Sequence, residues 1–577
     1  MPVILHTALD ASRSRLRRGL AATSAAALVF VLGSGAAPPS PRRQAPSLIV
    51  VLSIDQFRGD YVELYGHQWT GGLRRLLRDG AQFPLAAFAH LNTVTCTGHA
   101  TIGTGTFPSS HGLILNTWWD RDTLRDVPCT EDSDARHVPL AEGVTAPPGA
   151  GHSARRLLVP TFADELRARA VVPPRIVAFS LKARSAIMLT GRRADAIAWF
   201  DDQLGWMTSS AYGTPPPYLG AYVTAHPVAR DAGKTWTRAL PPAQYLFEDA
   251  GLAEDPPRGW TSTFPHALPG SPDAPGAEVG GLWTYTPMAD AYLGALAAES
   301  VRALGIGRGG GTDYLAVSFS TLDVTGHAFG PRSHEVQDVL AGLDQTIGRL
   351  LDDLDRLVGR GAYTVVLTGD HGVAPIPEQM RELGLDAGRL PDSQIAARVD
   401  SALEPFLGPG KHVARLAYTD LYFATGVLER IHATPGAYDA VVSAIGAAPG
   451  VERVLLGRDL PGLRGDADAR VRAAALGYVP ERSGDLIIVP RPYWPNSRRG
   501  TTHGTSNNYD QRVPVVLMGA GIRPGTYFAP ATPADIAPTL AYLAGTGMSR
   551  PDGRVLHEAL QVSRSLQQRT EPPTASH

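Results

Sequence analysis

Short apolar runs, rich in Val, Ile and Leu, recur along the chain and end at polar or glycine-containing loops. They cover residues 47–55, 175–180, 314–322, 363–367, 485–489 and 513–518. A continuous apolar run of this kind is typical of a strand that is buried on both faces, as the strands of a parallel sheet are. The runs therefore predict a central, mostly parallel sheet.

Helical patterns lie between these runs. The clearest is in residues 336–357, where apolar side chains step by fours and threes: Val336, Leu340, Leu343, Ile347, Leu350, Leu354 and Leu357. This spacing predicts one helix with an apolar face, and a shorter helix is expected around residues 71–79. Because strands alternate with helices, we predict an α/β sandwich with helices on both faces of the sheet.

Two long stretches interrupt this alternation. Residues 199–300 are rich in Pro, Gly, Trp and Tyr, and residues 376–480 lie between two of the predicted strands. We interpret both as cap insertions that cover the active edge of the sheet, within one catalytic domain that extends from residue 47 to 560. Residues 561–577 are expected to form a disordered tail.

The N-terminal residues are different in kind. Four arginines between residues 13 and 18 precede an apolar run at 20–32 and small residues at 33–37. This order predicts a secretory signal peptide over residues 1–37, followed by a linker at 38–46. The apolar run is short for a membrane span, although an uncleaved signal anchor is an alternative and the export route stays open. We expect a periplasmic or secreted protein without a membrane span after cleavage.

The overall charge of the chain gives no indication of a polyanionic partner. The formal net charge of −2 gives no indication of a nucleic-acid partner. We expect a monomer that acts on small molecules.

Candidate metal ligands follow the predicted strands. Asp55 ends the first apolar run, at the edge where open α/β sheets bind ligands. Asp323 and His327 are four residues apart, so on a helical turn both face one point. Asp370 and His371 are adjacent, and His503 lies in a later glycine-containing loop. Carboxylates and imidazoles suit Zn²⁺ better than Mn²⁺ or Fe, and six ligands are too many for one tetrahedral zinc. The set therefore predicts two Zn²⁺ per chain.

A threonine-rich stretch supplies a candidate nucleophile. Residues 92–105 hold five threonines, three glycines and a histidine, a composition that is atypical of both an apolar core and a surface helix. One hydroxyl at a helix start would lie beside free backbone N–H groups that favour an anion, although a simple N-capped turn is the alternative. Beside two metal ions, such a hydroxyl can be an activated nucleophile.

Together these motifs resemble the alkaline phosphatase superfamily, and most closely its zinc-dependent phosphomonoesterases with a threonine nucleophile, the PafA-like branch. The resemblance rests on SIDQ at 53–56, TCTGHA at 95–100, TG at 104–105, P-x-x-HG at 108–112, Asn116, SLKAR at 180–184, DVTGH at 323–327, GDHG at 369–372 and HG at 503–504. The order of these motifs holds from about residue 47 to 560.

The resemblance implies roles for the matched residues. One zinc ion is expected at Asp323, His327 and His503, and the second at Asp55, Asp370, His371 and the oxygen of Thr95. Thr95 is preferred over Thr93 and Thr97 as the nucleophile, because the family's threonine lies four residues before a histidine, here His99. The phosphoryl oxygens are expected to contact Asn116, Lys182 and Arg184. The last two indicate the monoesterase arrangement, because the diesterase branch has an apolar pocket there.

The remaining candidates have simpler interpretations. Cys96 and Cys129 are the only cysteines, and in an exported protein they most simply form one disulfide. Cys96 as a nucleophile or a formylglycine precursor fits poorly, because Ala100 stands where that modification needs Arg. His99 and His111 are expected to brace the threonine-rich stretch through hydrogen bonds. His334, Asp338 and the stretch 507–510 are read as structural.

We therefore predict an exported alkaline phosphatase that hydrolyses phosphate monoesters through a covalent phosphothreonine. A phosphodiesterase or nucleotide pyrophosphatase on the same fold is the alternative among enzymes. An inactive, metal-binding module is the alternative of a different class.

Overall fold

The computed structural model of the protein describes residues 45–203 and 205–561. The predicted signal peptide, nearly all of the predicted linker and all but the first residue of the predicted tail lie outside these residues. Within the described part of the chain, no helix is long and apolar enough to cross a membrane.

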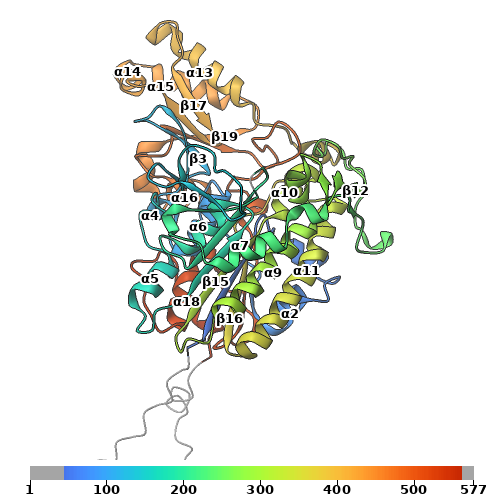
Figure 1. The fold of residues 1–577 in the computed structure, drawn as a ribbon. Helices are drawn as coiled ribbons and strands as arrows, with labels where there is room; N and C mark the ends of the chain where they lie inside the picture. Colours follow the sequence, from blue (N-terminus) through green and yellow to red (C-terminus); the bar gives the residue numbers. More distant parts are fainter. Residues whose placement is uncertain (1–44, 204, 562–577) are drawn as a thin grey trace, which may run out of the picture. The chain divides into compact units, whose positions relative to one another are not determined.

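A ten-stranded mixed sheet forms the centre of the fold (Figure 1). Its middle five strands are parallel: β16 (Tyr363–Gly369), β1 (Leu48–Ile54), β15 (Asp313–Phe319), β8 (Ile176–Ser180) and β9 (Ala196–Asp201). Antiparallel pairings add β21 (Val515–Gly519) and β2 (Ala81–Phe83) on one side, and β10 (Gly205–Ser209) and β6 (His137–Pro139) on the other. The short strand β22 (Gly525–Thr526) completes the sheet beside β2. The predicted α/β fold is confirmed.

Four adjacent parallel strands end at nearly the same level. Ile54 of β1 pairs with Phe319 of β15 and with Gly369 of β16, and Ser318 pairs with Ser180 of β8. The residues that follow these strands therefore lie along one edge of the sheet. Consecutive strands β15 and β16 lie on opposite sides of β1, and such a switch in strand order is where open α/β sheets bind ligands.

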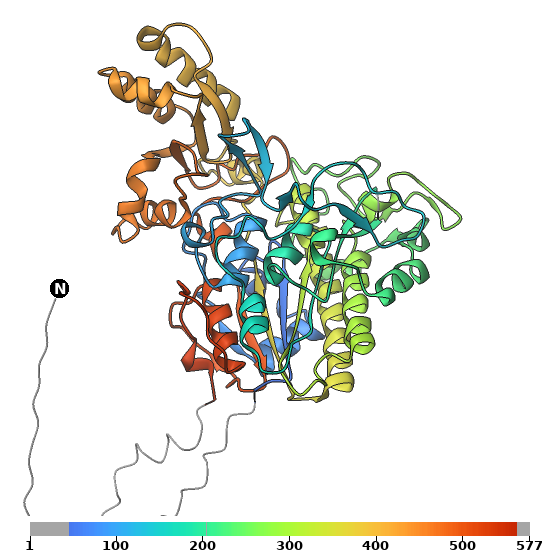
Figure 2. The ribbon, with the colours of Figure 1, turned by 60° about the vertical axis from the view of Figure 1, so that its left-hand side comes forward.

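Side chains of β1 alternate between two apolar clusters, one on each face of the sheet. The first face is covered by α2 (Gly72–Asp79), α9 (Pro287–Leu304) and α11 (His334–Leu354), which include the two helices expected from the sequence. The second face is covered by α3 (Thr95–Thr104), α5 (Phe162–Arg169), α6 (Ala183–Thr190) and α18 (Ile536–Leu543). Figures 1 and 2 show the two groups on opposite sides of the strands.

A separate four-stranded antiparallel sheet is built largely from the second interrupting stretch. Its order is β17 (Val413–Ala417), β18 (Asp420–Phe423), β20 (Leu486–Pro490) and β19 (Val451–Leu456). With α13 (Asp392–Leu407), α14 (Val427–Ala433) and α15 (Ala437–Gly446) it has its own apolar cluster. We call this sheet and its helices the cap.

Two expectations for strands are wrong in detail. The run at residues 485–489 was expected in the central sheet, but β20 lies in the cap sheet. It pairs on both sides there and is fully buried, which demands the same apolar sequence as a central strand. The run at 314–322 ends as a strand at Phe319, because Thr321 and Leu322 already belong to α10 (Thr321–Phe329).

A buried carboxylate of α11 binds the first interrupting stretch, residues 199–300, to the core. Asp338 of α11 accepts hydrogen bonds from the Trp236 indole N–H and the Ala239 backbone N–H, at 2.6 Å each, and from the Tyr245 hydroxyl. Asp338 was expected to be an ordinary helix-start residue, and its role is structural. Three donors compensate the cost of burying it.

Candidate active site

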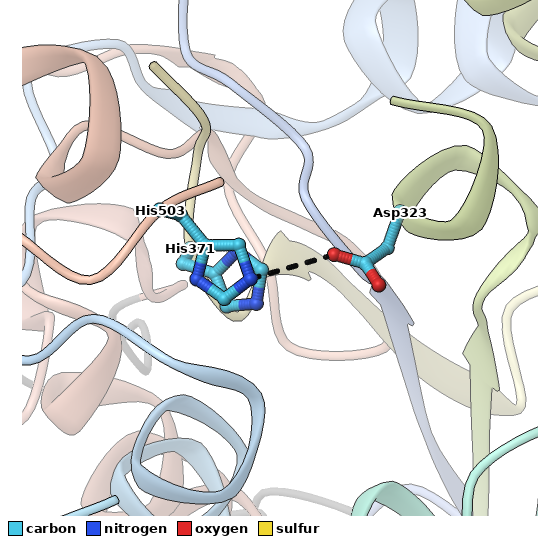
Figure 3. Close-up of side chains that lie close together, drawn as sticks. All are labelled: Asp323, His371 and His503. Carbon is cyan, nitrogen blue, oxygen red and sulfur yellow. Dashed lines mark ion pairs between the residues drawn. The ribbon is translucent and has the colours of Figure 1, made fainter. Parts of the chain in front are cut away.

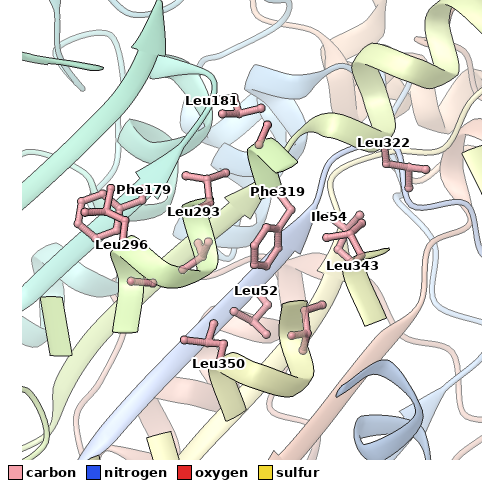
Figure 4. Packing of buried hydrophobic residues seen from close by; sticks show 14 of the residues in the cluster. Leu52, Ile54, Phe179, Leu181, Leu293, Leu296, Phe319, Leu322, Leu343 and Leu350 are labelled. Carbon is pink, nitrogen blue, oxygen red and sulfur yellow. The ribbon is translucent and has the colours of Figure 1, made fainter. Parts of the chain in front are cut away.

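The predicted site residues lie together at the aligned strand ends. Asp55 follows β1, Asp370 and His371 follow β16, Lys182 follows β8 just before α6, and Asp323 lies on α10 after β15. Beneath them is an apolar floor to which Ile54, Leu181 and Leu322 contribute, each directly preceding a site residue (Figure 4). The close packing of this floor limits how far the polar side chains above it can move.

One group of possible metal ligands combines Asp55, Asp370 and His371. One ligand atom from each lies within 4.8 Å of the others, and all three residues are buried. Asp55 Oδ1 and Asp370 Oδ2 are buried and accept no well-formed hydrogen bond among the described residues. Their nearest partners are imidazole nitrogens: His371 Nε2 lies 3.3 Å from each oxygen, and His99 Nδ1 lies 3.0 Å from Asp370 Oδ2. Buried carboxylate oxygens are costly unless positive charge satisfies them, so this group fits a divalent metal ion.

A second group combines Asp323, His371 and His503, again with ligand atoms within 4.8 Å of one another (Figure 3). Asp323 Oδ1 lies 3.3 Å from His327 Nε2 and 3.6 Å from His503 Nε2, so both predicted histidine partners lie beside this carboxylate. The rings of His371 and His503 stack with centroids 3.5 Å apart. His371 therefore lies between the two groups, where the sequence assigned it to one.

The three histidines share one orientation. Each has its Nδ1 within hydrogen-bond distance of a backbone carbonyl: His327 with Thr501 at 2.9 Å, His371 with Gly372 at 2.9 Å and His503 with Thr93 at 2.8 Å. An N–H at Nδ1 leaves the Nε2 lone pair free, and metal-binding histidines are oriented in this way. In the tautomer that these contacts favour, each histidine can offer its Nε2 to a metal ion.

The site concentrates negative charge around one ammonium group. Lys182 Nζ donates to Asp55 Oδ2 at 2.6 Å and to Asp323 Oδ2, so it touches both groups of ligands. Burial and mutual repulsion with Asp323 oppose ionisation of Asp55, but Lys182 and His371 outweigh them and hold its pKa below the ordinary value. Burial lowers the pKa of His371, but Asp370 and Asp55 raise it to about 9. Such an anionic cavity favours multivalent cations.

The threonine-rich stretch forms helix α3, and Thr95 is its first residue. The Thr95 hydroxyl lies 3.5 Å from His371 Nε2, beside the group of Asp55, Asp370 and His371. A hydroxyl at this position is near the positive end of the α3 dipole and near the possible metal ligands.

Every residue of α3 is buried, contrary to the expectation that its composition suits neither a core nor a surface helix. The burial is possible because the polar groups have partners. Thr97 donates to the backbone oxygens of Asn92 and Val94 at 2.9 Å, and Thr101 contacts the rings of His90 and His111. These hydrogen bonds compensate the burial of the polar side chains, while Cys96, Ala100 and Ile102 of the same helix join the apolar cluster on the second face.

Asn116 and Arg184 have free donors on the nucleophile side of the site. The Cys96 N–H donates to Asn116 Oδ1 at 2.7 Å, which leaves the Asn116 amide N–H₂ available. Arg184 lies in the first turn of α6, and its Nε is buried without a hydrogen-bond partner. No carboxylate lies within ion-pair distance of Arg184 among the residues that the structure describes. A partly buried guanidinium without an acid partner favours an anionic ligand.

Gln56, to which the sequence analysis gave no role, and His99 orient the carboxylates. The Gln56 N–H donates to Asp370 Oδ1 at 3.0 Å, and its Nε2 donates to Asp323 Oδ1 at 2.9 Å. His99 Nδ1 lies 2.9 Å from the Thr95 carbonyl and 3.0 Å from Asp370 Oδ2. His99 was expected to brace the loop, but its proximity to Asp370 links α3 to the carboxylate as well. Only the position of Gln56 directly after Asp55 could have indicated its role.

The fold and this arrangement together define a hydrolase of the alkaline phosphatase superfamily. The chain belongs to the type I phosphodiesterase / nucleotide pyrophosphatase family, whose sequence model matches residues 49–512. Within it, the chain is an alkaline-phosphatase-type enzyme of the PafA-like branch.

The similarity extends over most of each relative. The chain is 30% identical to alkaline phosphatase PafA of Elizabethkingia meningoseptica, over 86% of this chain and 91% of that protein. It is 28% identical to alkaline phosphatase PhoV of Synechococcus elongatus, over 88% and 92% respectively. A crystal structure of wild-type PafA matches with a TM-score of 0.81 and 28% identity, covering 90% of this chain and 99% of that chain. Murine ectonucleotide pyrophosphatase / phosphodiesterase 5 shares the fold, with a TM-score of 0.52 and 14% identity.

A disulfide joins Cys96 of α3 to Cys129, across 33 residues of sequence. Asn116 lies within this loop and bonds to both cysteines, since its side chain accepts from Cys96 N–H and its carbonyl from Cys129 N–H at 2.9 Å. The disulfide thus stabilises the first turn of α3 together with Asn116.

Replacing both cysteines (Cys96→Ala with Cys129→Ala) is expected to lower the free energy of unfolding by about 3–4 kcal/mol, because the unfolded chain regains the freedom of a 33-residue loop. Urea denaturation of the double variant and the wild type measures the difference. Reduced wild type is the matched control and should match the double variant. A loss below about 1 kcal/mol would mean that the disulfide does not brace this region.

Proposed function

We propose that the protein hydrolyses phosphate monoesters with two zinc ions and a covalent phosphothreonine at Thr95. The observation that carries this proposal is the position of the Thr95 hydroxyl, at the start of α3 and 3.5 Å from His371 Nε2. A hydroxyl so placed beside two groups of metal ligands is suited to act as a nucleophile.

Thr95 is the nucleophile of the first step and the leaving group of the second. In the first step its hydroxyl oxygen attacks the phosphorus of the ester as the bond to the alcohol oxygen breaks, and the proton of the hydroxyl ends on the departing alcohol. Water then attacks the phosphorus of phosphothreonine, which releases inorganic phosphate and restores the hydroxyl. The α3 N-terminus favours the negative charge that develops at this oxygen.

Two ions are proposed to bind at the six-residue set of Asp55, Asp323, His327, Asp370, His371 and His503. When bound, they would supply Lewis-acid stabilisation of the attacking and leaving oxygens and lower the pKa of the threonine hydroxyl. This assignment is supported by the Nε2 atoms that the backbone contacts leave available, and by the buried oxygens of Asp55 and Asp370 that accept no well-formed hydrogen bond among the described residues.

Three side chains are proposed to bind the phosphoryl oxygens: Asn116 through its free amide N–H₂, Lys182 as a point charge and Arg184 as a two-pronged donor. A monoester dianion carries one more negative charge than a diester, so cationic donors favour it. The absence of an acid partner for Arg184 among the described residues supports this preference. On binding, Lys182 would exchange part of its contact with Asp55 and Asp323 for the substrate.

The exported location and the monomeric state are proposed from the sequence alone. The arginine-rich start and the apolar run at 20–32 support export. A disulfide in the fold is compatible with an oxidising compartment.

Thr95→Ala is expected to lower kcat for 4-nitrophenyl phosphate by at least about 10³-fold, because the covalent route is lost. Thr95→Ser is the matched variant and should retain measurable turnover through phosphoserine. Thr106→Ala controls for loss of a buried threonine, because among the described residues the Thr106 hydroxyl bonds to Thr104 alone. Turnover of Thr95→Ala at the wild-type rate would exclude Thr95 as the nucleophile.

Wild-type enzyme is expected to prefer a phosphate monoester to its methyl diester. Lys182→Ala and Arg184→Ala should each lower kcat/KM for the monoester by about 10²-fold, and that for the diester by much less, because a diester lacks the second charge. Parallel kinetics on the two esters measure the ratio. A wild type that prefers the diester would indicate a phosphodiesterase or nucleotide pyrophosphatase instead.

A further inference from the structure

The cap reaches the site through one hairpin tip. Tyr418 and Thr419 form the two-residue turn between β17 and β18, since Ala417 pairs with Asp420. Tyr418 has φ of 53°, and a turn position with positive φ usually belongs to glycine. A bulky residue held in this conformation indicates that its side chain is needed there.

Buried hydrogen bonds fix this tip to the loop before Thr95. Thr419 Oγ1 donates to Asn92 Oδ1 at 2.6 Å, and Asn92 Nδ2 donates to Asp420 Oδ2 at 3.0 Å. The Asn92 carbonyl in turn accepts from the Val94 N–H at 2.9 Å and from the Thr97 hydroxyl. These bonds therefore fix the hairpin tip and the loop before Thr95, which we call the nucleophile loop, relative to each other.

The Tyr418 ring lies on the His503 side of the site. A methyl group placed on Gly504 would lie 3.3 Å from the Tyr418 ring and 3.2 Å from Val94, so both side chains lie against Gly504. Burial raises the pKa of the Tyr418 phenol, and the charge of Arg184 lowers it while that of Asp323 raises it. The ring lies against Gly504, the residue that directly follows the predicted metal ligand His503.

A cavity of about 510 Å³ continues from this ring. Its lining includes Tyr418, Thr117 and Asn496, and Thr117 directly follows Asn116. The cavity lies between the cap and the hairpin of β3 (Thr117–Asp120) and β4 (Arg125–Pro128). An ion pair between Arg415 of the cap and Asp126 of the hairpin, at 2.9 Å, joins the two. Figure 2 shows this hairpin beside the cap sheet. Its volume is that of a small-ligand pocket, so an organic group that passes Tyr418 and Thr117 would fit in it.

We propose that Tyr418 is a specificity-determining residue whose ring contacts the alcohol part of the substrate and favours phosphate esters of phenols over those of small alkyl alcohols. The inference rests on the proposed function, because it requires a phosphate ester at the site. Asn116, Lys182 and Arg184 already serve the phosphoryl oxygens, and the apolar face of Tyr418 suits a planar ring. Offset or edge-to-face stacking of two rings adds to the gain from burial.

The test compares phenyl phosphate with methyl phosphate in wild type, Tyr418→Gly and Tyr418→Phe. Tyr418→Gly removes the ring at a backbone position that glycine accepts without strain. It should lower kcat/KM for phenyl phosphate about 3- to 10-fold. The kcat/KM for methyl phosphate and the inhibition constant of inorganic phosphate should stay unchanged. Tyr418→Phe keeps the ring and should retain the preference. Tyr438→Ala, on α15 of the cap, is the matched control and should change none of these values.

Equal losses on both substrates in Tyr418→Gly would overturn the inference, because they would mean a structural role. Loss in Tyr418→Phe as large as in Tyr418→Gly, with weaker inhibition by phosphate, would also overturn it and place the hydroxyl at the phosphoryl group. Failure of the proposed function is recognised separately, by a wild type that prefers a methyl diester. The comparison then uses methyl phenyl phosphate and dimethyl phosphate, and it decides the role of Tyr418 in the same way.

Discussion

The burial of three carboxylates at one edge of the sheet is the constraint on which the rest of the site depends. Asp55, Asp323 and Asp370 are buried close together, and the aligned ends of β1, β15 and β16 keep them there. Like charges in a buried site repel one another and raise the cost of ionisation. The arrangement therefore requires compensating positive charge. Among the described residues, the Lys182 ammonium lies at ion-pair distance from Asp55 and Asp323, and His371 Nε2 lies 3.3 Å from oxygens of Asp55 and Asp370. This requirement explains both the fit to divalent metal ions and the position of a lysine between the two groups of ligands.

The neighbouring residues hold this charged centre in place. Gln56 donates to two of the carboxylates, and backbone carbonyls orient the three histidines. The nucleophile loop is held from two further directions, by the disulfide at Cys96 and by the contacts of Asn92 with the cap hairpin. Precise placement of reacting groups contributes strongly to catalysis, and several independent supports provide it here.

The parts of this structure that follow from local rules could be predicted from the sequence. The spacing of Asp323 and His327 requires a helical turn to bring them together, and α10 provides it. Apolar runs identified the strands, but an apolar run reports burial and not the sheet to which a strand belongs, so β20 was assigned to the wrong sheet. Full burial of α3 was missed because segments distant in sequence cover it, such as the backbone at Asp370 against Gly98 and at Met188 against Gly103. The contact of Tyr418 with Gly504 joins residues far apart in sequence and has no local signal.

The most direct test of the two-metal, threonine-nucleophile site is a crystal structure of the enzyme grown with zinc and vanadate, with anomalous scattering measured at the zinc edge. We predict two zinc peaks, one at the group of Asp323, His327 and His503 and one at the group of Asp55, Asp370 and His371. We also predict vanadium bonded to Thr95 Oγ1, with Asn116, Lys182 and Arg184 on its oxygens. A single metal peak, or vanadate bound away from Thr95, would contradict this prediction.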